Sequence, residues 1–418
     1  MTYRSRVVDQ ELALRLASTG AVVIEGPKAC GKTVTGRRMA ASEVLLDIDE
    51  EARLAVGVDP ALVLAGDTPR LIDEWQNEPS IWNHVRRAVD DRGRPGQFIL
   101  TGSAVPADDV TRHSGAGRLT LLRMRPMSLF ETGHATGAIA VRALLDGVPP
   151  RNPATEHTVQ QVAEWIAVGG WPGHLDRGLT PAEAQRANRD YLDEIRRVDV
   201  PRVDGARRDP EKIGRLLRSL ARNVATQAGV ATMAADASGP DTPLKAHTAQ
   251  AYLSALARLM IVEDQPAWTA HLRSRARLRS TPKRHFVDPS LAVSALAAAP
   301  DRLLKDLNLL GLLFESLVVR DLRIYAQAND AEVLHYRDNT GLEVDAIVQA
   351  ADGRWAAFEI KLGPGRVDEG ARNLLKFADR VDQAVCGAPS SLGVIVATGY
   401  GYQRPDGVGV IPVTALGP

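Results

Sequence analysis

A glycine-rich turn near the N-terminus carries residue types that bind phosphate. Residues 22–33 read V-V-I-E-G-P-K-A-C-G-K-T, an apolar run followed by the pattern G-x-x-x-x-G-K-[ST]. With this spacing, backbone N–H groups surround a β-phosphate, Lys32 reaches the β/γ oxygens and Thr33 offers its hydroxyl to Mg²⁺ at the start of a helix. The helix-like stretch after the turn makes a chance match the weaker alternative. The expected nucleoside triphosphate site comprises Gly26, Pro27, Lys28, Ala29, Cys30, Gly31, Lys32, Thr33 and Val34.

Two adjacent carboxylates follow a second apolar run, R-L-I-D-E at residues 70–74. We expect Asp73 to hold Mg²⁺ through its water shell and Glu74 to polarise the attacking water. Adjacent acids at a strand end are also common as solvated turn residues, but the phosphate-binding turn upstream favours the catalytic interpretation. The acid pair therefore extends the prediction from nucleotide binding to ATP hydrolysis, with ATP and Mg²⁺ as cofactors.

A third apolar run, F-I-L-T-G-S-A, ends in small hydroxyl residues. Ser103, with Thr101 as the alternative, is expected to hydrogen-bond the γ-phosphate or the attacking water, although a simple strand exit would give the same pattern. Arg118, Arg123 and Arg125 follow, and an arginine can stabilise γ-phosphate charge in its own chain or across a subunit contact. Arg118 is the first choice, and structural ion pairing is the alternative for each.

A second set of charged residues lies near the C-terminus, in E-V-D-A-I-V and A-A-F-E-I-K. Glu359 and Lys361 are two residues apart and so lie on one face of a strand. A hairpin that adds Asp345 forms an oxygen-rich Mg²⁺ site beside an ammonium, which suits phosphodiester hydrolysis, and Glu315 could add a fourth group. The pattern alone also arises on solvated hairpins, but here the carboxylates interrupt apolar strands, where an unpaired charge is costly.

A basic segment precedes that region, H-L-R-S-R-A-R-L-R-S-T-P-K-R-H. Alternate spacing on an extended ribbon puts its arginines on one face, like the wing of a winged-helix domain, and residues 248–262 would be the recognition helix. Such a face could neutralise DNA phosphates with little sequence preference. A solvated face, or a surface that binds the chain's own acids, is the alternative. The candidate residues are Arg273, Arg275, Arg277, Arg279, Lys283 and Arg284.

The composition is that of a globular protein with several domains. The chain has 418 residues, 44% of them hydrophobic, and its 51 basic residues equal its 51 acidic ones, so net charge does not indicate a polyanionic partner. The two cysteines show no pattern that predicts a disulfide, and the N-terminus does not resemble a signal peptide. No apolar run is long enough for a membrane span, so we expect a cytoplasmic protein. A homo-oligomer is possible.

The elements that must position these residues follow from the hydrophobic periodicity. Short apolar runs alternate with helical stretches up to residue 130, which predicts a parallel sheet of an α/β fold. Residues 160–290 have helical periodicity, and short strands return after residue 305. The predicted division is a P-loop ATPase domain (1–132), a helical linker or lid (133–204), a winged-helix-like domain (205–290) and a C-terminal α/β domain (291–418).

The order of these motifs resembles a family of bacterial and archaeal AAA+-type ATPases with a winged-helix middle and a C-terminal domain like the PD-(D/E)XK nucleases. The resemblance covers most of the chain, through G-P-K-A-C-G-K-T, L-I-D-E-W-Q, V-G-G-W-P-G, K-R-H-F-V-D-P-S-L, E-V-D-A-I-V and F-E-I-K among others. It implies that Glu315, Asp345, Glu359 and Lys361 fall on nuclease-type positions. The resemblance does not predict which substrate the protein acts on.

Three functional hypotheses follow. The first is an ATP-dependent protein that binds DNA, double-stranded or branched, and controls a Mg²⁺-dependent nuclease-like domain through its nucleotide state. The second is a nucleotide-gated regulatory ATPase, of a defence or toxin–antitoxin type, whose C-terminal fold does not cut. In the third, the C-terminal acids are structural and pair with the basic segment.

Overall fold

The computed structural model describes residues 3–103, 114–153, 156–203, 205, 208–239, 243–270 and 280–418. These residues form two compact units. The first unit contains residues 1–126, 198–208 and 254–261, and the second contains residues 127–197, 209–253 and 262–418. The four-part division expected from the sequence remains a prediction. Among the described helices, none combines the length and the apolar character needed to cross a membrane.

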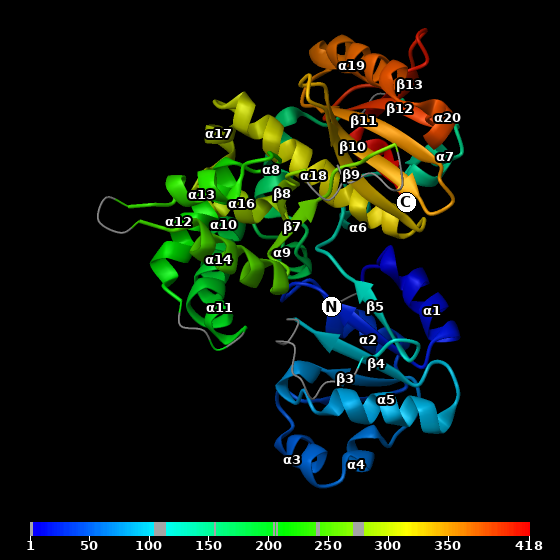
Figure 1. Cartoon of the computed structure of the whole chain (residues 1–418), viewed down its shortest axis with the longest axis vertical. Coiled ribbons are helices and arrows are strands. Elements are labelled where there is room, and N and C mark those ends of the chain that lie inside the picture. The colour runs from blue at the N-terminus through cyan, green and yellow to red at the C-terminus, as the bar shows by residue number, and fades with distance from the viewer. Residues whose placement is uncertain are drawn as a thin grey trace. The chain divides into compact units, whose positions relative to one another are not determined.

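A parallel sheet forms the centre of the first unit (Figure 1). Its strands are β1 (Ala21–Glu25), β2 (Ser42–Leu45), β3 (Arg70–Asp73), β4 (Phe98–Gly102) and β5 (Leu119–Arg123). The order is β2-β3-β4-β1-β5, and every neighbouring pair is parallel. The N-terminal parallel α/β sheet predicted from the apolar runs is therefore confirmed. Because the strands are parallel, the residues that follow β1, β3 and β4 meet at one edge of the sheet.

Helices cover both faces of this sheet, namely α1 (Val8–Ser18), α2 (Lys32–Met39), α3 (Glu50–Val58), α4 (Pro60–Leu64) and α5 (Ile81–Arg92). Successive side chains of β1 point to opposite faces. Ala21 and Val23 pack in one buried cluster with residues of α3, α4 and α5, whereas Val22 and Ile24 pack in another with residues of α1. Burial of both faces explains why the strands are apolar without alternation.

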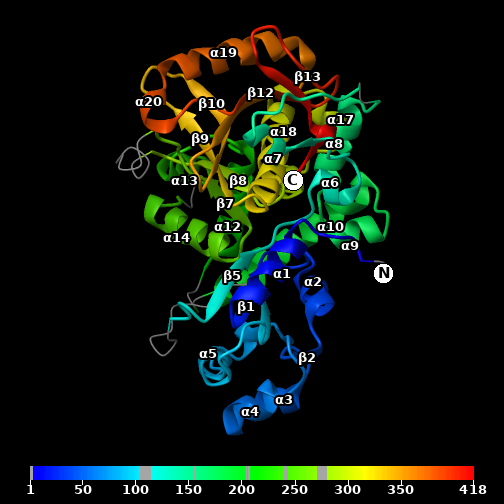
Figure 2. The same ribbon diagram turned by 90° about the vertical axis from the view of Figure 1, so that its right-hand side faces the viewer.

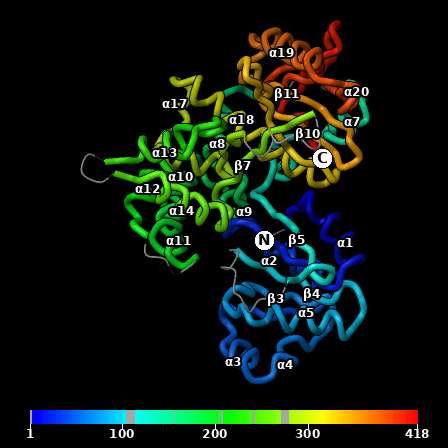
Figure 3. The backbone as a smooth tube through the Cα atoms, in the orientation of Figure 1, coloured from blue at the N-terminus to red at the C-terminus, as the bar shows by residue number. Residues whose placement is uncertain are grey.

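The stretch between the two sheets is mainly helical, as its periodicity predicts (Figures 1 and 3). Its helices are α6 (Leu129–Thr132), α7 (Val141–Leu145), α8 (Val159–Val168), α9 (Pro172–Asp176), α10 (Pro181–Glu194), α11 (Val200–Arg202), α12 (Pro210–Arg222), α13 (Val230–Asp236), α14 (Ala246–Arg258), α16 (Pro289–Ala295) and α17 (Pro300–Leu303). Local signals begin several of them. In α10, for example, Thr180 and Glu183 form a reciprocal capping box and Pro181 occupies the first helical position.

A mixed sheet forms the second α/β part of the chain (Figure 2). Its strands are β9 (Ala331–Arg337), β10 (Glu343–Ala350), β11 (Trp355–Lys361), β12 (Ser391–Val396), β13 (Tyr402–Gln403) and β14 (Gly409–Pro412). The order is β13-β14-β12-β11-β10-β9, with an antiparallel β9-β10-β11 meander and parallel β11-β12-β14 pairing. The long helix α18 (Leu307–Gln327) and helix α19 (Val367–Arg380) cover opposite faces, and α20 (Gln383–Cys386) follows α19.

Two shorter pairings join distant segments to this sheet. Strands β6 (Ile139–Ala140) and β15 (Leu416–Gly417) are parallel, so residues 416–417 pair with a segment that the sequence predicted to be part of a helical linker or lid. Strands β7 (Val262–Gln265) and β8 (Lys283–Phe286) form an antiparallel pair. After β7 the chain runs beside β9, where Trp268 N donates to His335 O at 2.6 Å. Thus β8 is held close to the second sheet.

An aromatic cluster forms the centre of the core under α19. Trp268 lies 5.2 Å from Trp355, and Tyr336 lies 4.7 Å from Phe377, between ring centroids. Trp355 is fully buried, and its indole N–H donates to Cys386 O at 3.0 Å. Such rings stabilise a core both through the apolar area that they bury and through favourable ring–ring geometry.

We predict that Trp355→Ala lowers the free energy of unfolding of the second unit by about 3–5 kcal/mol, because it leaves a cavity in this core and an unpaired carbonyl. Chemical denaturation of the full chain measures the change. The control is Leu307→Ala, at a side chain that is 60% exposed, which should change the same quantity by less than about 0.5 kcal/mol. Equal effects of the two substitutions would contradict the assignment of this core.

Candidate functional sites

The phosphate loop lies between β1 and α2, as its sequence predicts. Gly31 has φ 103°, a left-handed conformation that favours glycine, and α2 begins at the next residue. A Cβ atom at Gly26 would lie 2.3 Å from Met124 O, so the backbone there can approach β5 only as glycine. Lys32 is buried and donates from Nζ to Pro27 O at 2.9 Å. The loop thus presents backbone amides and one buried ammonium at the start of a helix.

Three oxygen-bearing side chains meet beside the loop. Thr33 Oγ1 donates to Asp73 Oδ1 at 2.9 Å, and Thr101 Oγ1 donates to the same carboxylate oxygen. Asp73 is 5% exposed at the end of β3, and Thr101 lies on the neighbouring β4. A hydroxyl and a carboxylate next to a phosphate-binding loop are the donors that Mg²⁺ takes together with substrate phosphates. Thr33 and Asp73 therefore fit the predicted magnesium site, and Thr101 positions Asp73.

Glu74 follows β3 in a left-handed conformation, with φ 51°. Its Oε2 accepts from Ser103 Oγ at 3.2 Å and from Gln76 Nε2. The structure thus brings the expected water-activating glutamate and the expected sensor serine together. Gln76 was missed, although its amide lies only two residues beyond the acid pair in the sequence. A non-glycine residue at positive φ is uncommon and is typical of constrained sites.

The arginines are divided between the two ends of the sheet. Arg118 precedes β5, and its carbonyl accepts from Ala21 N, at the start of β1, at 3.1 Å. Because the phosphate loop follows the other end of β1, Arg118 lies about 13 Å away, the length of that strand. Its guanidinium pairs with Asp90 at 2.8 Å. The expectation that Arg118 serves the site of its own chain is therefore wrong, and a role across a subunit contact stays a prediction.

The carboxyl end of β5 carries arginines much closer to the loop. Arg123 pairs in register with Glu25, the last residue of β1. Arg6, which was missed, donates from Nη1 to Cys30 O at 2.9 Å and from Nη2 to Arg125 O at 2.7 Å, and so links the loop to the segment after β5. Lys28, expected to contact nucleotide, pairs instead with Asp199 at 2.6 Å.

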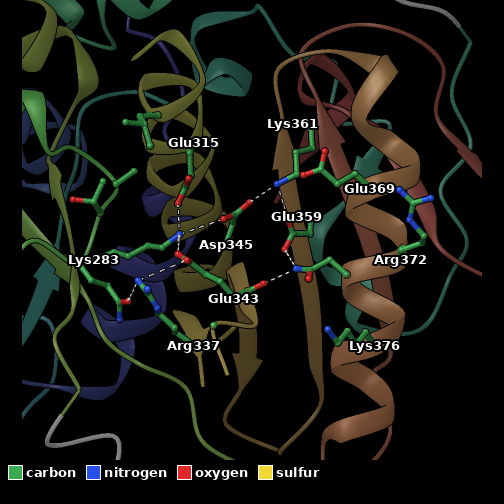
Figure 4. A pocket seen from close by; sticks show the side chains of 16 residues that line it. Lys283, Glu315, Arg337, Glu343, Asp345, Glu359, Lys361, Glu369, Arg372 and Lys376 are labelled. Carbon is green, nitrogen blue, oxygen red and sulfur yellow. Dashed lines mark hydrogen bonds and ion pairs between the residues drawn. The ribbon is translucent and has the colours of Figure 1, made fainter. Parts of the chain in front are cut away.

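A second candidate site is a cavity of about 600 Å³ in the second unit (Figure 4). It lies between α18 and α19, beside the ends of β10 and β11. Its lining is rich in charges of both signs, namely Glu315, Glu343, Asp345, Glu359, Glu369, Lys283, Arg337, Lys361, Arg372 and Lys376. All four residues that the sequence placed on nuclease-type positions, Glu315, Asp345, Glu359 and Lys361, meet here.

Lys283 lies at the centre of the acids rather than on an exposed surface. Its Nζ is 2.7 Å from Glu315 Oε1, 3.0 Å from Glu343 Oε1 and 3.2 Å from Asp345 Oδ1, and its side chain is 2% exposed. The expectation that Lys283 contacts nucleic acid is therefore wrong. The third hypothesis, in which the acids pair with the basic segment, holds for this one residue. Nothing in the spacing of K-R-H-F separates this lysine from the arginines before it.

Lys361 supplies a second ammonium on the other side of Asp345. Its Nζ is 2.5 Å from Glu359 Oε2 and 3.4 Å from Asp345 Oδ2. Asp345 Oδ2 also accepts from Ile360 N at 2.9 Å, and Glu359 Oε1 accepts from Asn373 Nδ2 at 2.6 Å. Asn373 was not predicted, and neither was Glu343, although Glu343 and Asp345 share one strand face.

The protonation of these groups follows from burial and charge. Burial lowers the pKa of Lys283, but the carboxylates of Glu315, Asp345 and Glu343 outweigh this and raise it well above its usual value. The opposite balance applies to Asp345, where burial raises the pKa but Lys283 and Lys361 lower it below its usual value. Burial, with Asp345 nearby, raises the pKa of Glu315 and of Glu359 to about 8. Of Glu315, Asp345 and Glu359, Asp345 therefore keeps its negative charge down to the lowest pH.

These residues do not fit the expected metal site. Among the described residues, no group of three or more histidine, cysteine, aspartate or glutamate side chains is arranged to hold a metal ion. Asp345 and Glu359 direct their oxygens at ammonium, amide and backbone N–H donors instead. The expectation that Asp345 and Glu359 hold Mg²⁺ is corrected here, because Lys283 and Lys361 already neutralise them.

Of the other residues predicted to form the nucleic-acid face, the structure describes only Arg284. Arg273, Arg275, Arg277 and Arg279 lie outside the described residues. Arg284 is largely buried, donates from Nη1 to Ala228 O at 2.7 Å and lies 3.5 Å from Asp264. Two other cations, Arg372 and Lys376, are exposed on α19 at the pocket, one helical turn apart.

Comparison with known proteins agrees with the first site. Residues 18–133 match a family described as an AAA domain, whose members generally use ATP and Mg²⁺. Residues 159–302 and 310–416 match two families described as domains of unknown function, DUF8612 and DUF4143. Two proteins described as uncharacterized, from Mycobacterium bovis and Mycobacterium tuberculosis, are each 26% identical over 352 residues, which cover 81% of this chain and 70% of theirs.

A buried histidine beside Lys283 makes stability depend on pH. Burial lowers the pKa of His335 to about 4; Lys283 and Arg337 add to this, and Glu343 opposes it. In the unfolded chain the imidazole binds a proton near pH 6.5, so the unfolded state holds more protons between about pH 6.5 and 4. We therefore predict that the contribution of His335 to the free energy of unfolding falls as the pH drops through this window, by up to about 1.4 kcal/mol per pH unit for one proton, whereas the raised pKa values of Glu315 and Glu359 act in the opposite direction.

Denaturant titrations between pH 4.5 and 7.5 test this prediction. Relative to the unchanged chain, His335→Gln should gain free energy of unfolding as the pH falls through the window, because glutamine does not titrate. His84→Gln, at an exposed histidine, should show no such pH-dependent difference. A difference between His335→Gln and the unchanged chain that stays constant with pH would contradict the prediction.

Proposed function

We propose that this chain, whose residues 18–133 match an AAA domain, binds ATP with Mg²⁺ and hydrolyses it. The observation that supports this most directly is the contact of Thr33 and Thr101 with the buried carboxylate of Asp73 beside the phosphate loop. Bound Mg²⁺ would neutralise phosphate charge, with Thr33 and Asp73 to hold it. Lys32 and the loop amides orient the phosphates, and Glu74, held by Ser103 and Gln76, accepts the proton of the attacking water.

Two substitutions separate binding from hydrolysis. Lys32→Ala should weaken ATP binding about ten- to hundredfold, because a charged hydrogen bond to phosphate is lost. Glu74→Gln should keep ATP binding and lower kcat by about 10²–10⁴-fold, because only the proton acceptor is removed. Calorimetric ATP titration and phosphate release measure the two quantities. The matched control is Arg37→Ala on α2, which breaks an exposed ion pair with Glu43 of β2 and should change neither. Full turnover by Glu74→Gln would remove this glutamate from the mechanism.

We further propose that the nucleotide state controls a second activity, DNA binding. The support is the series of four arginines at 273, 275, 277 and 279 in the sequence and the exposed Arg372 and Lys376 at the pocket of the second unit. Phosphate contacts of this kind position DNA without reading its sequence. Of the two roles that the sequence left open for the C-terminal region, the geometry favours the one that does not cut, because Asp345 and Glu359 are neutralised within the protein.

Binding to linear, branched and single-stranded DNA, with and without ATP and Mg²⁺, tests this proposal. Replacing the four arginines at 273, 275, 277 and 279 by glutamine should reduce the slope of log Kd against log salt by about 3–4, because each phosphate that an arginine neutralises contributes about one. The control replaces four exposed, ion-paired arginines by glutamine, namely Arg222, Arg354, Arg366 and Arg380. Unchanged salt dependence would reject the segment as the DNA-binding surface. Mg²⁺-dependent cleavage that is abolished by Asp345→Ala would instead establish a nuclease.

A further inference from the structure

We propose that the ammonium of Lys283 is the resident cation of the second-unit pocket, and that it excludes divalent metal from the carboxylates there. The proposal deepens the non-cleaving role proposed above, on which it rests for its functional meaning. Its test involves neither ATP nor DNA, so it can fail while that role stands.

The first argument is the position of the ammonium. Lys283 Nζ lies within 2.7–3.2 Å of oxygens from Glu315 on α18 and from Glu343 and Asp345 on β10. An ammonium has three N–H donors, so three carboxylates use all of them. A metal ion bound by the same oxygens would lie about 2.0–2.6 Å from each, which is the space that Nζ fills. Ammonium and metal cannot both be present.

The second argument is that Lys283 is fixed by its strand. In β8 it pairs with Gln265 of β7. Gln265 in turn donates from Nε2 to Leu334 O at 2.9 Å and to Asp345 O at 3.0 Å, which ties β7 to β9 and β10. His285, two residues after Lys283 and on the same face, contacts Ser316 Oγ at 3.2 Å. The backbone on both sides of the acids is therefore joined through buried polar contacts, and a movement of β8 away from the acids would break them.

The third argument is that the remaining acceptors also have donors. Asp345 uses Oδ1 for Lys283 and Oδ2 for Ile360 N and Lys361, whereas Glu359 uses its two oxygens for Asn373 and Lys361. A metal ion at this pair would have to displace several protein donors at once. Arg372 and Lys376, by contrast, have no hydrogen bond or ion pair among the described residues, and they lie at the edge of the pocket.

Mn²⁺ titration of the full chain, followed by electron paramagnetic resonance without nucleotide, tests the proposal. All proteins carry Asp73→Asn, so that the phosphate-loop site does not contribute. With Lys283 present, additional Asp345→Asn should leave Mn²⁺ binding unchanged. With Lys283→Met, one additional Mn²⁺ should bind, and Asp345→Asn should abolish it. Lys376→Met removes a cation from the same pocket and should add no Mn²⁺.

Three outcomes would overturn the proposal. They are Mn²⁺ binding that depends on Asp345 while Lys283 is present, a folded Lys283→Met protein that gains no site, and an equal gain in Lys376→Met. If Lys283→Met folds poorly, a measurement of thermal stability provides a second test. Lys283→Gln should lower Tm, and millimolar Mn²⁺, but not NaCl of equal ionic strength, should restore part of the loss. If neither lysine variant folds, the titration with Lys283 in place decides alone.

Discussion

One buried ion-pair cluster organises the second unit. Arg320, in the middle of α18, lies 2.7 Å from Asp288 Oδ2 and 2.7 Å from Asp321 Oδ1, and all three side chains are at most 2% exposed. The carboxylates have further donors, since Asp288 accepts from Gly170 N and Asp321 from Leu129 N, both at 3.0 Å. Such a cluster adds little net stability, because desolvation offsets the attraction, but removal of one member leaves an uncompensated buried charge. It therefore fixes where α18 lies against its neighbours.

The position of α18 determines the chemistry of the pocket. Glu315 is five residues before Arg320 on the same helix, and it reaches Lys283 only if the helix is held in this register. The two sites thus use carboxylates in different ways. Asp73 accepts from neutral hydroxyls, which leaves its negative charge available to a cation, whereas Asp345 faces two ammonium groups that already balance it. The two sites contain similar residue types, but they differ in the charge of the groups that contact the carboxylate.

The sequence predicts the first site well and the second only in part. The phosphate loop, the acid pair and the strand before Ser103 each carry their information in a short stretch, and parallel strands then bring those stretches to one sheet edge. In the second unit, hydrophobic patterns predict β10 and β11, and so the meeting of Asp345, Glu359 and Lys361. Arg118 was misplaced because its role depends on which end of a strand it occupies, and the spacing of residues does not state this.

Lys283 shows where prediction from local pattern ends. In the sequence it follows a series of arginines, and the acids that it contacts lie far along the chain, at 315, 343 and 345. Only the pairing of β8 with β7, and of the segment after β7 with β9, brings them together. A motif of acids and a lysine is therefore not enough to assign a metal-dependent activity, because a third element can supply the cation. What decides is the charge balance of all the side chains that reach the site.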